Sequence, residues 1–122
     1  MSQPTVAIIG ASADPAKFGN QSVRAHAAQG YEVFPINPRG GVIEGLTVYE
    51  SLSAAPVDRF DRVSLYVPPK VGLALLDEIA AKGCDELWLN PGTESEAVVT
   101  RARELGLEPI VACSIVEVNS RP

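Results

Sequence analysis

An α/β fold built on a doubly wound, mainly parallel sheet is predicted by three features of this sequence. Apolar runs of strand length alternate with segments whose apolar residues recur at helical spacing. The first run, residues 5–9, is short and nearly all β-branched, which is typical of a strand buried on both faces. Glycines follow the helical segments at positions 30, 83 and 106. This alternation implies right-handed βαβ units and a sheet of about five strands with helices on both faces.

The strands are expected where the apolar runs lie. Five runs are predicted as sheet strands: residues 5–9, 31–36, 62–67, 85–89 and 107–111. Pro35 cannot donate to a ladder, so we expect its strand to be shortened or irregular near the end. A minor strand over residues 46–49 and a short edge strand over 116–118 complete the prediction.

Helices are expected between these strands. Residues 21–29 form the first predicted helix, and Val71, Leu75 and Ile79 mark the second by their spacing. The run Thr93-Glu94-Ser95-Glu96 predicts a capping box at the start of the third, with a hydroxyl first and a carboxylate three residues later. In such a sheet the carboxyl ends of the strands share one edge, and ligands bind there.

Length and charge limit the function. The chain has 122 residues, which suits one domain over residues 1–122 and is too short for a two-domain dehydrogenase or ligase. A net charge of −5 and few aromatic residues argue against nucleic acid and anionic membranes as partners. No apolar run reaches the length of a membrane span, so we expect a cytoplasmic protein. Cys84 and Cys113 are expected to be free thiols.

The loop after the first strand, residues 10–20, is predicted to bind phosphate. Its small residues let a ligand approach the backbone, and the helix that follows presents unpaired N–H groups. Ser12 and Pro15 replace the later glycines of the dinucleotide fingerprint, and no P-loop sequence is present. Gly19 adds a second flexible point. Ser12 and Lys17 are the predicted phosphate ligands, and the alternative is that they serve only in a turn and on a solvated surface.

The sequence of the loop after the second strand helps to distinguish between possible nucleotide ligands. An NAD site places a carboxylate there to hold the ribose hydroxyls, whereas this chain has Asn37-Pro38-Arg39. A missing acid and a nearby arginine favour a phosphorylated ribose, as in NADP or coenzyme A. The alternative is an exposed loop cation.

Catalytic groups are few. His26, the only histidine, lies within the first predicted helix and is expected to be a packed or surface residue, so no nucleophile pair is predicted. Cys113 lies in a loop at the carboxyl edge. It is either an inert buried thiol or a thiol available for exchange.

Five segments together resemble the small single-domain CoA-binding proteins, which have a Rossmann-like fold. These proteins are similar to the N-terminal CoA-binding domain of the succinyl-CoA synthetase α subunit. The resemblance covers nearly the whole chain and depends on residues 6–12, 30–38, 48–52, 66–69 and 87–92.

The resemblance implies coenzyme A or an acyl-CoA as ligand, with the first loop at the pyrophosphate, Pro38-Arg39 near the 3′-phosphate and Val67-Pro68 near adenine or pantetheine. The ligand-binding residues expected at this edge are Gly10, Ala11, Ser12, Lys17, Phe18, Gly19, Asn37, Pro38, Arg39, Val67, Pro68, Asn90, Pro91, Gly92 and Cys113.

Two departures from the family affect the predicted function. The Arg-Cys-Pro type motif of the last loop is Ala112-Cys113-Ser114 here, and the synthetase histidine belongs to a second domain that does not align. We therefore expect a binding or regulatory module without independent catalysis, in a homodimer. An NADP-binding oxidoreductase-like domain acting with a partner is the alternative.

Overall fold

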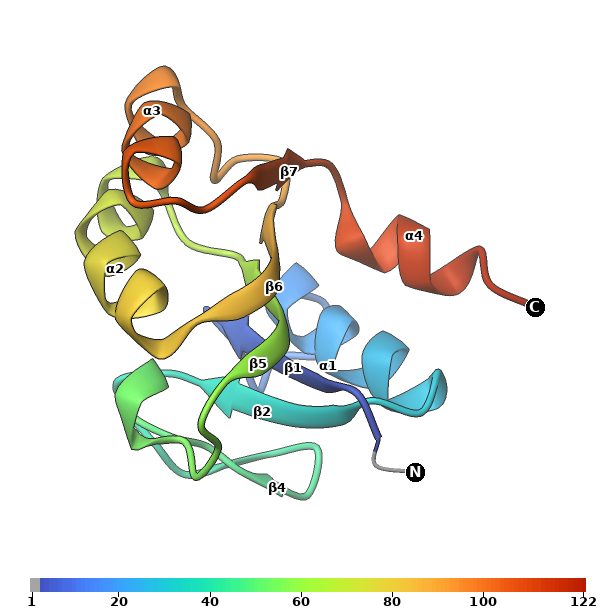
Figure 1. Ribbon diagram of the computed structural model, residues 1–122. Coiled ribbons are helices and arrows are strands. Elements are labelled where there is room, and N and C mark those ends of the chain that lie inside the picture. The colour runs from blue at the N-terminus through green and yellow to red at the C-terminus, as the bar shows by residue number, and fades with distance from the viewer. Residues whose placement is uncertain (1–2) are drawn as a thin grey trace.

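The fold is centred on a five-stranded parallel sheet (Figure 1). The computed structural model describes residues 3–122. The sheet strands are β1 (Thr5–Ile9), β2 (Glu32–Ile36), β5 (Phe60–Leu65), β6 (Cys84–Leu89) and β7 (Pro109–Val111), in the spatial order β2-β1-β5-β6-β7. The predicted α/β, Rossmann-like sheet of about five strands is thus confirmed.

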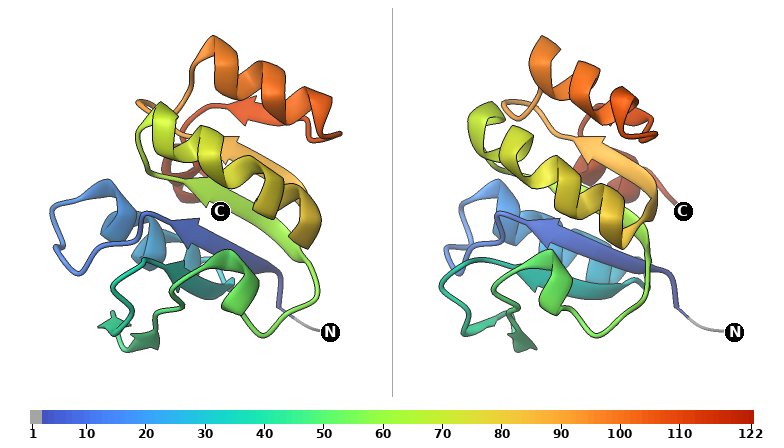
Figure 2. Two further views of the ribbon diagram at one scale, coloured as in Figure 1. Left: turned by 90° about the vertical axis from the view of Figure 1, so that its left-hand side faces the viewer. Right: turned by 60° about the vertical axis from the view of Figure 1, so that its left-hand side comes forward.

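Two pairs of helices cover the sheet. The helices α2 (Pro69–Lys82) and α3 (Glu96–Glu104) pack together on one face, and α1 (Phe18–Ala28) and α4 (Ser114–Asn119) pack together on the other (Figures 1 and 2). This three-layer arrangement buries both faces of the central strand β1, which explains why its sequence is almost continuously apolar.

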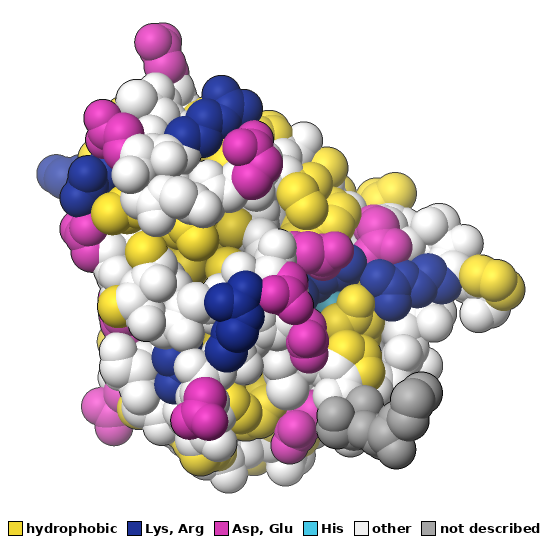
Figure 3. All heavy atoms as spheres, in the orientation of Figure 1, with side chains coloured by type: hydrophobic (Ala, Val, Ile, Leu, Met, Phe, Trp, Pro, Cys, Tyr) yellow, Lys and Arg dark blue, Asp and Glu magenta, His cyan; other side chains and the backbone are white. Residues whose placement is uncertain are grey.

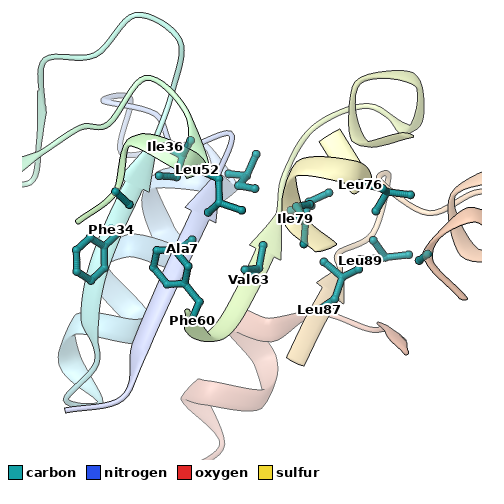
Figure 4. Packing of buried hydrophobic residues seen from close by; sticks show 14 of the residues in the cluster. Ala7, Phe34, Ile36, Leu52, Phe60, Val63, Leu76, Ile79, Leu87 and Leu89 are labelled. Atoms are coloured by element: carbon teal, nitrogen blue, oxygen red, sulfur yellow. The ribbon is translucent and has the colours of Figure 1, made fainter. Parts of the chain in front are cut away.

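The face beneath α2 and α3 is an apolar core (Figure 4). Side chains alternate along each strand, so Ala7, Val63 and Leu87 lie in register across three neighbouring strands and point to this face. The helix residues Leu76 and Ile79 pack onto them and are fully buried.

The opposite face is more polar. Its strand positions include Arg62 and Ser64 of β5, which are in register with Val6 and Ile8 of β1. The helix α1 contributes His26, which is also fully buried, and burial is the main reason that its pKa falls to about 4. The prediction of a packed histidine is therefore confirmed.

The prediction of a strand over residues 116–118 is wrong, because this segment belongs to α4. Ser114 and Val118 are both fully buried, at the four-residue spacing of one helical face, whereas Val116 is 67% exposed. Glu117 and Arg121 form an ion pair at the same spacing. These pairs explain why the segment is helical despite its β-branched residues.

The second strand is not shortened at Pro35. The carbonyl of Pro35 accepts a hydrogen bond from the Tyr49 N–H on the outer edge of β2. In a strand the N–H and C=O of one residue point to the same side, so the donor that proline lacks faces away from β1. The ladder with β1 therefore continues to Ile36.

Other boundaries also differ from the prediction. Helix α1 begins at Phe18 instead of residue 21. The cap of α3 is Ser95, whose hydroxyl accepts from the Val98 N–H, because Thr93 is used elsewhere. The minor strand is a hairpin of β3 (Val42–Ile43) and β4 (Leu46–Thr47), followed by a 3-10 turn, η1 (Leu52–Ala54).

Candidate functional site

The carboxyl edge of the sheet contains a topological switch point between β1 and β5. Counted along the chain among the five sheet strands, the spatial order is 2-1-3-4-5, so the connections diverge on either side of β1 and β5. Open α/β sheets bind ligands in the crevice that this divergence creates. The loops at residues 10–17 and 66–68 follow these two strands and form its walls.

Two glycines bring the walls of the crevice together. Gly10 has φ of +90°, and a Cβ there would lie 2.5 Å from the Tyr66 carbonyl oxygen. Gly19 has ordinary helical geometry, but a Cβ there would collide with the Gly10 carbonyl. Gly19 is therefore required for close packing of α1 against the β1 loop.

The start of α1 presents unpaired donors. Within residues 3–122, the backbone N–H groups of Phe18 and Gly19 have no hydrogen-bond acceptor, and neither do those of Ser12 and Ala13. Asp14 organises the turn by accepting from the Ala16 N–H, and its own N–H donates to the Ser12 hydroxyl. Free N–H groups at a helix N-terminus attract anions.

A cleft of about 540 Å³ lies in front of these donors. Lys17 and Phe18 form one side, and Val67 and Pro68 form the other. Phe18 is 68% exposed although it is a large aromatic residue, and it leaves apolar surface for a ligand to cover. The remaining lining residues include Gly10, Gly19, Tyr66, Pro91, Gly92 and Thr93.

A narrower apolar slot continues from this cleft toward β2. Its volume is about 140 Å³, and it shares Gly10 and Val67 with the cleft. Ile36 and Pro38 close it on the β2 side, and Val71 closes it on the α2 side. A flat apolar ring would fit such a slot.

A third, smaller cavity continues in the opposite direction, toward β6 and β7. It has a volume of about 60 Å³ and shares Phe18, Tyr66 and Pro91 with the cleft. Cys113 and Ile115 complete it from the end of β7 and the start of α4. Cys113 and Cys84 are free thiols, as the sequence predicts.

Several predicted site residues hold the loops together. The Asn37 amide donates to the Ala11 carbonyl at 2.8 Å, and its oxygen accepts from the Arg39 N–H at 2.9 Å. Ala11 is itself buried. These contacts join the β1 and β2 loops, so Asn37 and Ala11 shape the site through the backbone.

Asn90 has a similar role at the other end of the edge. Its amide nitrogen donates to the Ser64 hydroxyl and the Leu65 carbonyl, and its oxygen accepts from the N–H and hydroxyl of Ser114. Asn90 is buried, and these bonds fix the start of α4. Thr93 likewise donates to the Val67 carbonyl at 2.7 Å.

The cations at this edge are free for a ligand. Lys17 and Arg39 are exposed, and within residues 3–122 neither lies within ion-pair distance of a carboxylate. By contrast, Arg62 and Arg121 are committed to Glu117. On the face drawn in Figure 3, acidic and basic side chains of the described residues are interspersed. Attraction of an anion would therefore be local to Lys17, Arg39 and the backbone donors.

The sequence did not identify every residue that lines these clefts. Tyr66 lines both the cleft and the small cavity. Thr93, Val71 and Ile115 were not expected at all. The position of Ile115 depends on α4 being a helix, so no sequence signal could have revealed it once that segment was predicted as a strand.

A profile for a CoA binding domain matches residues 4–119, which is nearly the whole chain. The chain belongs to this CoA-binding domain family. The resemblance predicted from the sequence is thereby confirmed.

Two kinds of relative are similar to this CoA-binding domain. The α subunit of ADP-forming acetate–CoA ligase I from Pyrococcus furiosus is 38% identical over 85 residues, which are 65% of this chain and 18% of the subunit. The chain thus spans less than a fifth of that ligase subunit. The α subunit of ligase II from the same organism is 34% identical over 79 residues.

Solved structures with the same fold match most of this chain. A conserved hypothetical protein from Pyrococcus furiosus has a TM-score of 0.82 at 37% identity and covers 95% of this chain and 99% of its own. The dinucleotide-forming acetyl-coenzyme A synthetase 1 of Ca. Korarchaeum cryptofilum, solved with phosphate and ADP, has a TM-score of 0.76 at 29% identity, over 88% of this chain and 25% of the synthetase.

Two further features of the described residues concern membrane-spanning helices and clusters of metal ligands. No helix within residues 3–122 is long and apolar enough to cross a membrane. In the same part of the chain, no three His, Cys, Asp or Glu side chains gather as a metal site would require.

Proposed function

We propose that this protein binds coenzyme A or an acyl-CoA along the carboxyl edge of the sheet, as a binding or regulatory module without its own catalysis. The observation that carries the proposal is the order of the three connected cavities. An apolar slot, an anion-attracting cleft and a small apolar cavity follow one another from the β2 end to the β7 end. Coenzyme A has the same order of parts: adenine, then the pyrophosphate with the pantetheine arm, then the thiol end.

The pyrophosphate is assigned to the central cleft. The free N–H groups of Phe18 and Gly19 and the ammonium of Lys17 are the donors there. Each charge-assisted bond of this kind contributes about 1.5–3 kcal/mol when it is shielded from water. Ser12 supplies a further backbone donor on the same loop.

The adenosine end is assigned to the β2 side. Ile36, Val67 and Val71 offer apolar surface to the adenine ring. Arg39 lies in the loop after β2, and its guanidinium has no carboxylate partner among the described residues, so it is free to pair with the ribose 3′-phosphate. Arg39 forms this pair from an exposed loop, so the contribution is toward the lower end of the range.

The burial of the chain's single histidine favours a binding module over an enzyme. His26 is sealed inside the fold and does not line any of the three cavities. A homodimer in the cytoplasm is part of the proposal, and native mass spectrometry of the purified protein tests its oligomeric state and any bound ligand together.

NADP is the second candidate ligand, because the loop after β2 has Arg39 and no carboxylate at the end of the strand. NADP also carries adenosine with a phosphorylated ribose. The match of residues 4–119 to a CoA-binding domain family supports coenzyme A over NADP.

Calorimetric titration with CoA, dephospho-CoA, NADP and NAD tests the proposal. We expect CoA to bind most tightly and NAD most weakly. At a CoA concentration about 100 times its dissociation constant, the fold should gain about 2.7 kcal/mol of stability. Binding of NADP with no binding of CoA would transfer the proposal to the alternative, and binding of neither would refute both.

A further inference from the structure

The small cavity beside Cys113 has an unusual lining for a site next to an anion-binding cleft. Its six lining residues carry no formal charge: Phe18, Tyr66, Asn90, Pro91, Cys113 and Ile115. It opens from the central cleft through residues that the two share, on the side away from Arg39. A group that enters it would therefore leave the cationic part of the edge.

Apart from the Cys113 thiol, the polar side-chain atoms in this lining are already paired within the protein. Both ends of the Asn90 amide are bonded to Ser64, Leu65 and Ser114. The Tyr66 hydroxyl donates to the Ser22 hydroxyl at 2.8 Å and lies 2.8 Å from that of Ser114. Burial raises the pKa of Tyr66, so its phenol stays neutral. Among these side chains, a polar or charged ligand group would find only the Cys113 thiol free, and a thiol is a weak hydrogen-bonding group.

We propose that this cavity receives the acyl group of an acyl-CoA and selects short, uncharged, apolar acyl chains over chains that end in a carboxylate. The inference rests on the proposed function, because it requires pantetheine to run from the central cleft toward Cys113. Apolar chains are favoured because Phe18, Pro91 and Ile115 offer them apolar surface. A terminal carboxylate is disfavoured because it would lose its hydration without gaining a partner.

Titration with CoA, acetyl-CoA, butyryl-CoA, succinyl-CoA and octanoyl-CoA tests this selection. Butyryl and succinyl chains have the same number of carbons and differ by the terminal carboxylate. We expect each buried methylene to tighten binding about four-fold until the cavity is filled. Butyryl-CoA should bind about ten-fold or more tightly than succinyl-CoA. Octanoyl-CoA should gain nothing over butyryl-CoA, because the cavity is only about 60 Å³.

Two substitutions at Ile115 change the cavity in opposite directions. Ile115→Phe should remove the preference for butyryl-CoA over CoA, so that the ratio of the two affinities approaches one. Ile115→Ala should extend the accepted chain length. Val116→Phe is the matched control, because Val116 is the next residue of α4, is 67% exposed and does not line the cavity.

The outcomes separate this inference from the proposed function. Equal affinities for butyryl-CoA and succinyl-CoA, or a parallel loss of CoA and butyryl-CoA binding in Ile115→Phe, would overturn the acyl cavity while CoA binding still stands. If no CoA compound binds to the wild type, the proposed function and this inference both fail.

Discussion

On the face covered by α2 and α3, the sheet meets its helices through aliphatic and aromatic side chains, whereas the face covered by α1 and α4 has hydrogen bonds and a buried charge at its centre. The first face is represented by Phe60, Leu76 and Leu89, all almost completely buried. On the second, the Arg62 guanidinium lies over the rings of Trp88 and Tyr31, at 4.7 and 5.4 Å.

The polar face continues around this guanidinium. Its Nε and Nη2 atoms are each 2.8 Å from a carboxylate oxygen, of Glu86 and Glu117 respectively. Glu117 belongs to α4, and Asn90 fixes the start of the same helix.

This difference between the two faces indicates which helices need a defined position. Apolar contacts stabilise a helix without fixing its direction closely, whereas hydrogen bonds fix both distance and direction. Helices α1 and α4 are the ones that present Phe18 and Ile115 to the clefts. The polar network therefore connects the stability of the fold to the shape of the candidate site.

Truncation on the apolar face should have the largest effect. Leu76→Ala should reduce the free energy of unfolding by about 2–5 kcal/mol, because it leaves a cavity in a packed core. Urea denaturation measures this loss. Leu73→Ala, on the same helix but 37% exposed, is the control and should change stability much less. Equal losses in the two variants would contradict the packing described for α2.

Truncation on the polar face should affect both stability and binding. Asn90→Ala leaves the Ser114 N–H and the Ser64 hydroxyl short of a partner, so the free energy of unfolding should fall by about 2–3 kcal/mol. Because Asn90 fixes the start of α4, affinity for acyl-CoA should fall as well. Asn119→Ala, at the exposed end of α4, should change neither quantity. A stable Asn90→Ala protein would show that the network is dispensable.

Acidification should weaken the polar face selectively. Burial is the main cause that lowers the pKa of His26 from 6.5 to about 4, and the nearby Arg62 and Arg121 act in the same direction. A hydrogen bond to the Ser22 backbone and the charge of Glu117 act in the opposite direction. The unfolded chain then binds the extra proton between these values, so stability falls as the pH falls below 6.5. The expected loss between pH 7 and pH 5 is about 2 kcal/mol.

Urea denaturation across this pH range measures the loss, and His26→Gln is the comparison. The variant has no histidine, so it should lose little stability before the carboxylates begin to titrate. The same pH dependence in the variant and the wild type would assign the effect to other groups.

The smallest expected effect lies outside both faces, at Arg39. Arg39→Ala should weaken CoA about ten-fold and leave dephospho-CoA almost unchanged, since only CoA carries the 3′-phosphate. Lys17→Ala is the matched control and should weaken both ligands, because both contain the pyrophosphate. Calorimetry on these variants gives the coupling energy, and a value near zero would show that Arg39 does not contact that phosphate.

Most of the fold could be predicted because the strand signals were local. The apolar runs and the glycines at 30, 83 and 106 located the strands and helix ends to within a few residues. Residues 116–118 were predicted as a strand because β-branched residues favour strands. Their helix depends instead on tertiary contacts of Val118 and on the Arg62–Glu117 pair. No local pattern contains those contacts.

The sequence was enough to predict which loops form the candidate site, but not what each residue in them does. The loops with Gly10 and Arg39 were predicted from turn residues and the missing carboxylate. Asn37 and Asn90 were expected to contact the ligand, and the structure has their amides bonded to the β1 loop and to β5, respectively. Whether an amide faces a ligand or the protein depends on partners that are distant in sequence.

A further cavity, at the outer edge of β2, contrasts with those at the carboxyl edge. It has a volume of about 450 Å³, similar to the central cleft, and lies between the outer edge of β2 and the β3–β4 hairpin. Tyr31, Phe34 and Tyr49 line it. It lacks the helix N-terminus that supplies free N–H donors at the central cleft.

A titration of the ¹⁵N-labelled protein with CoA, followed by amide chemical shifts, tests whether CoA binds along the carboxyl edge of the sheet. We predict that the largest shifts fall on the loops at the carboxyl edge, residues 10–19, 37–41, 66–68, 90–92 and 112–115. Thr5 and Asp85, near the amino ends of their strands, should not shift. Large shifts at Phe34, Leu46 and Tyr49 with none at Phe18 and Gly19 would place the ligand at the hairpin cavity and contradict the account.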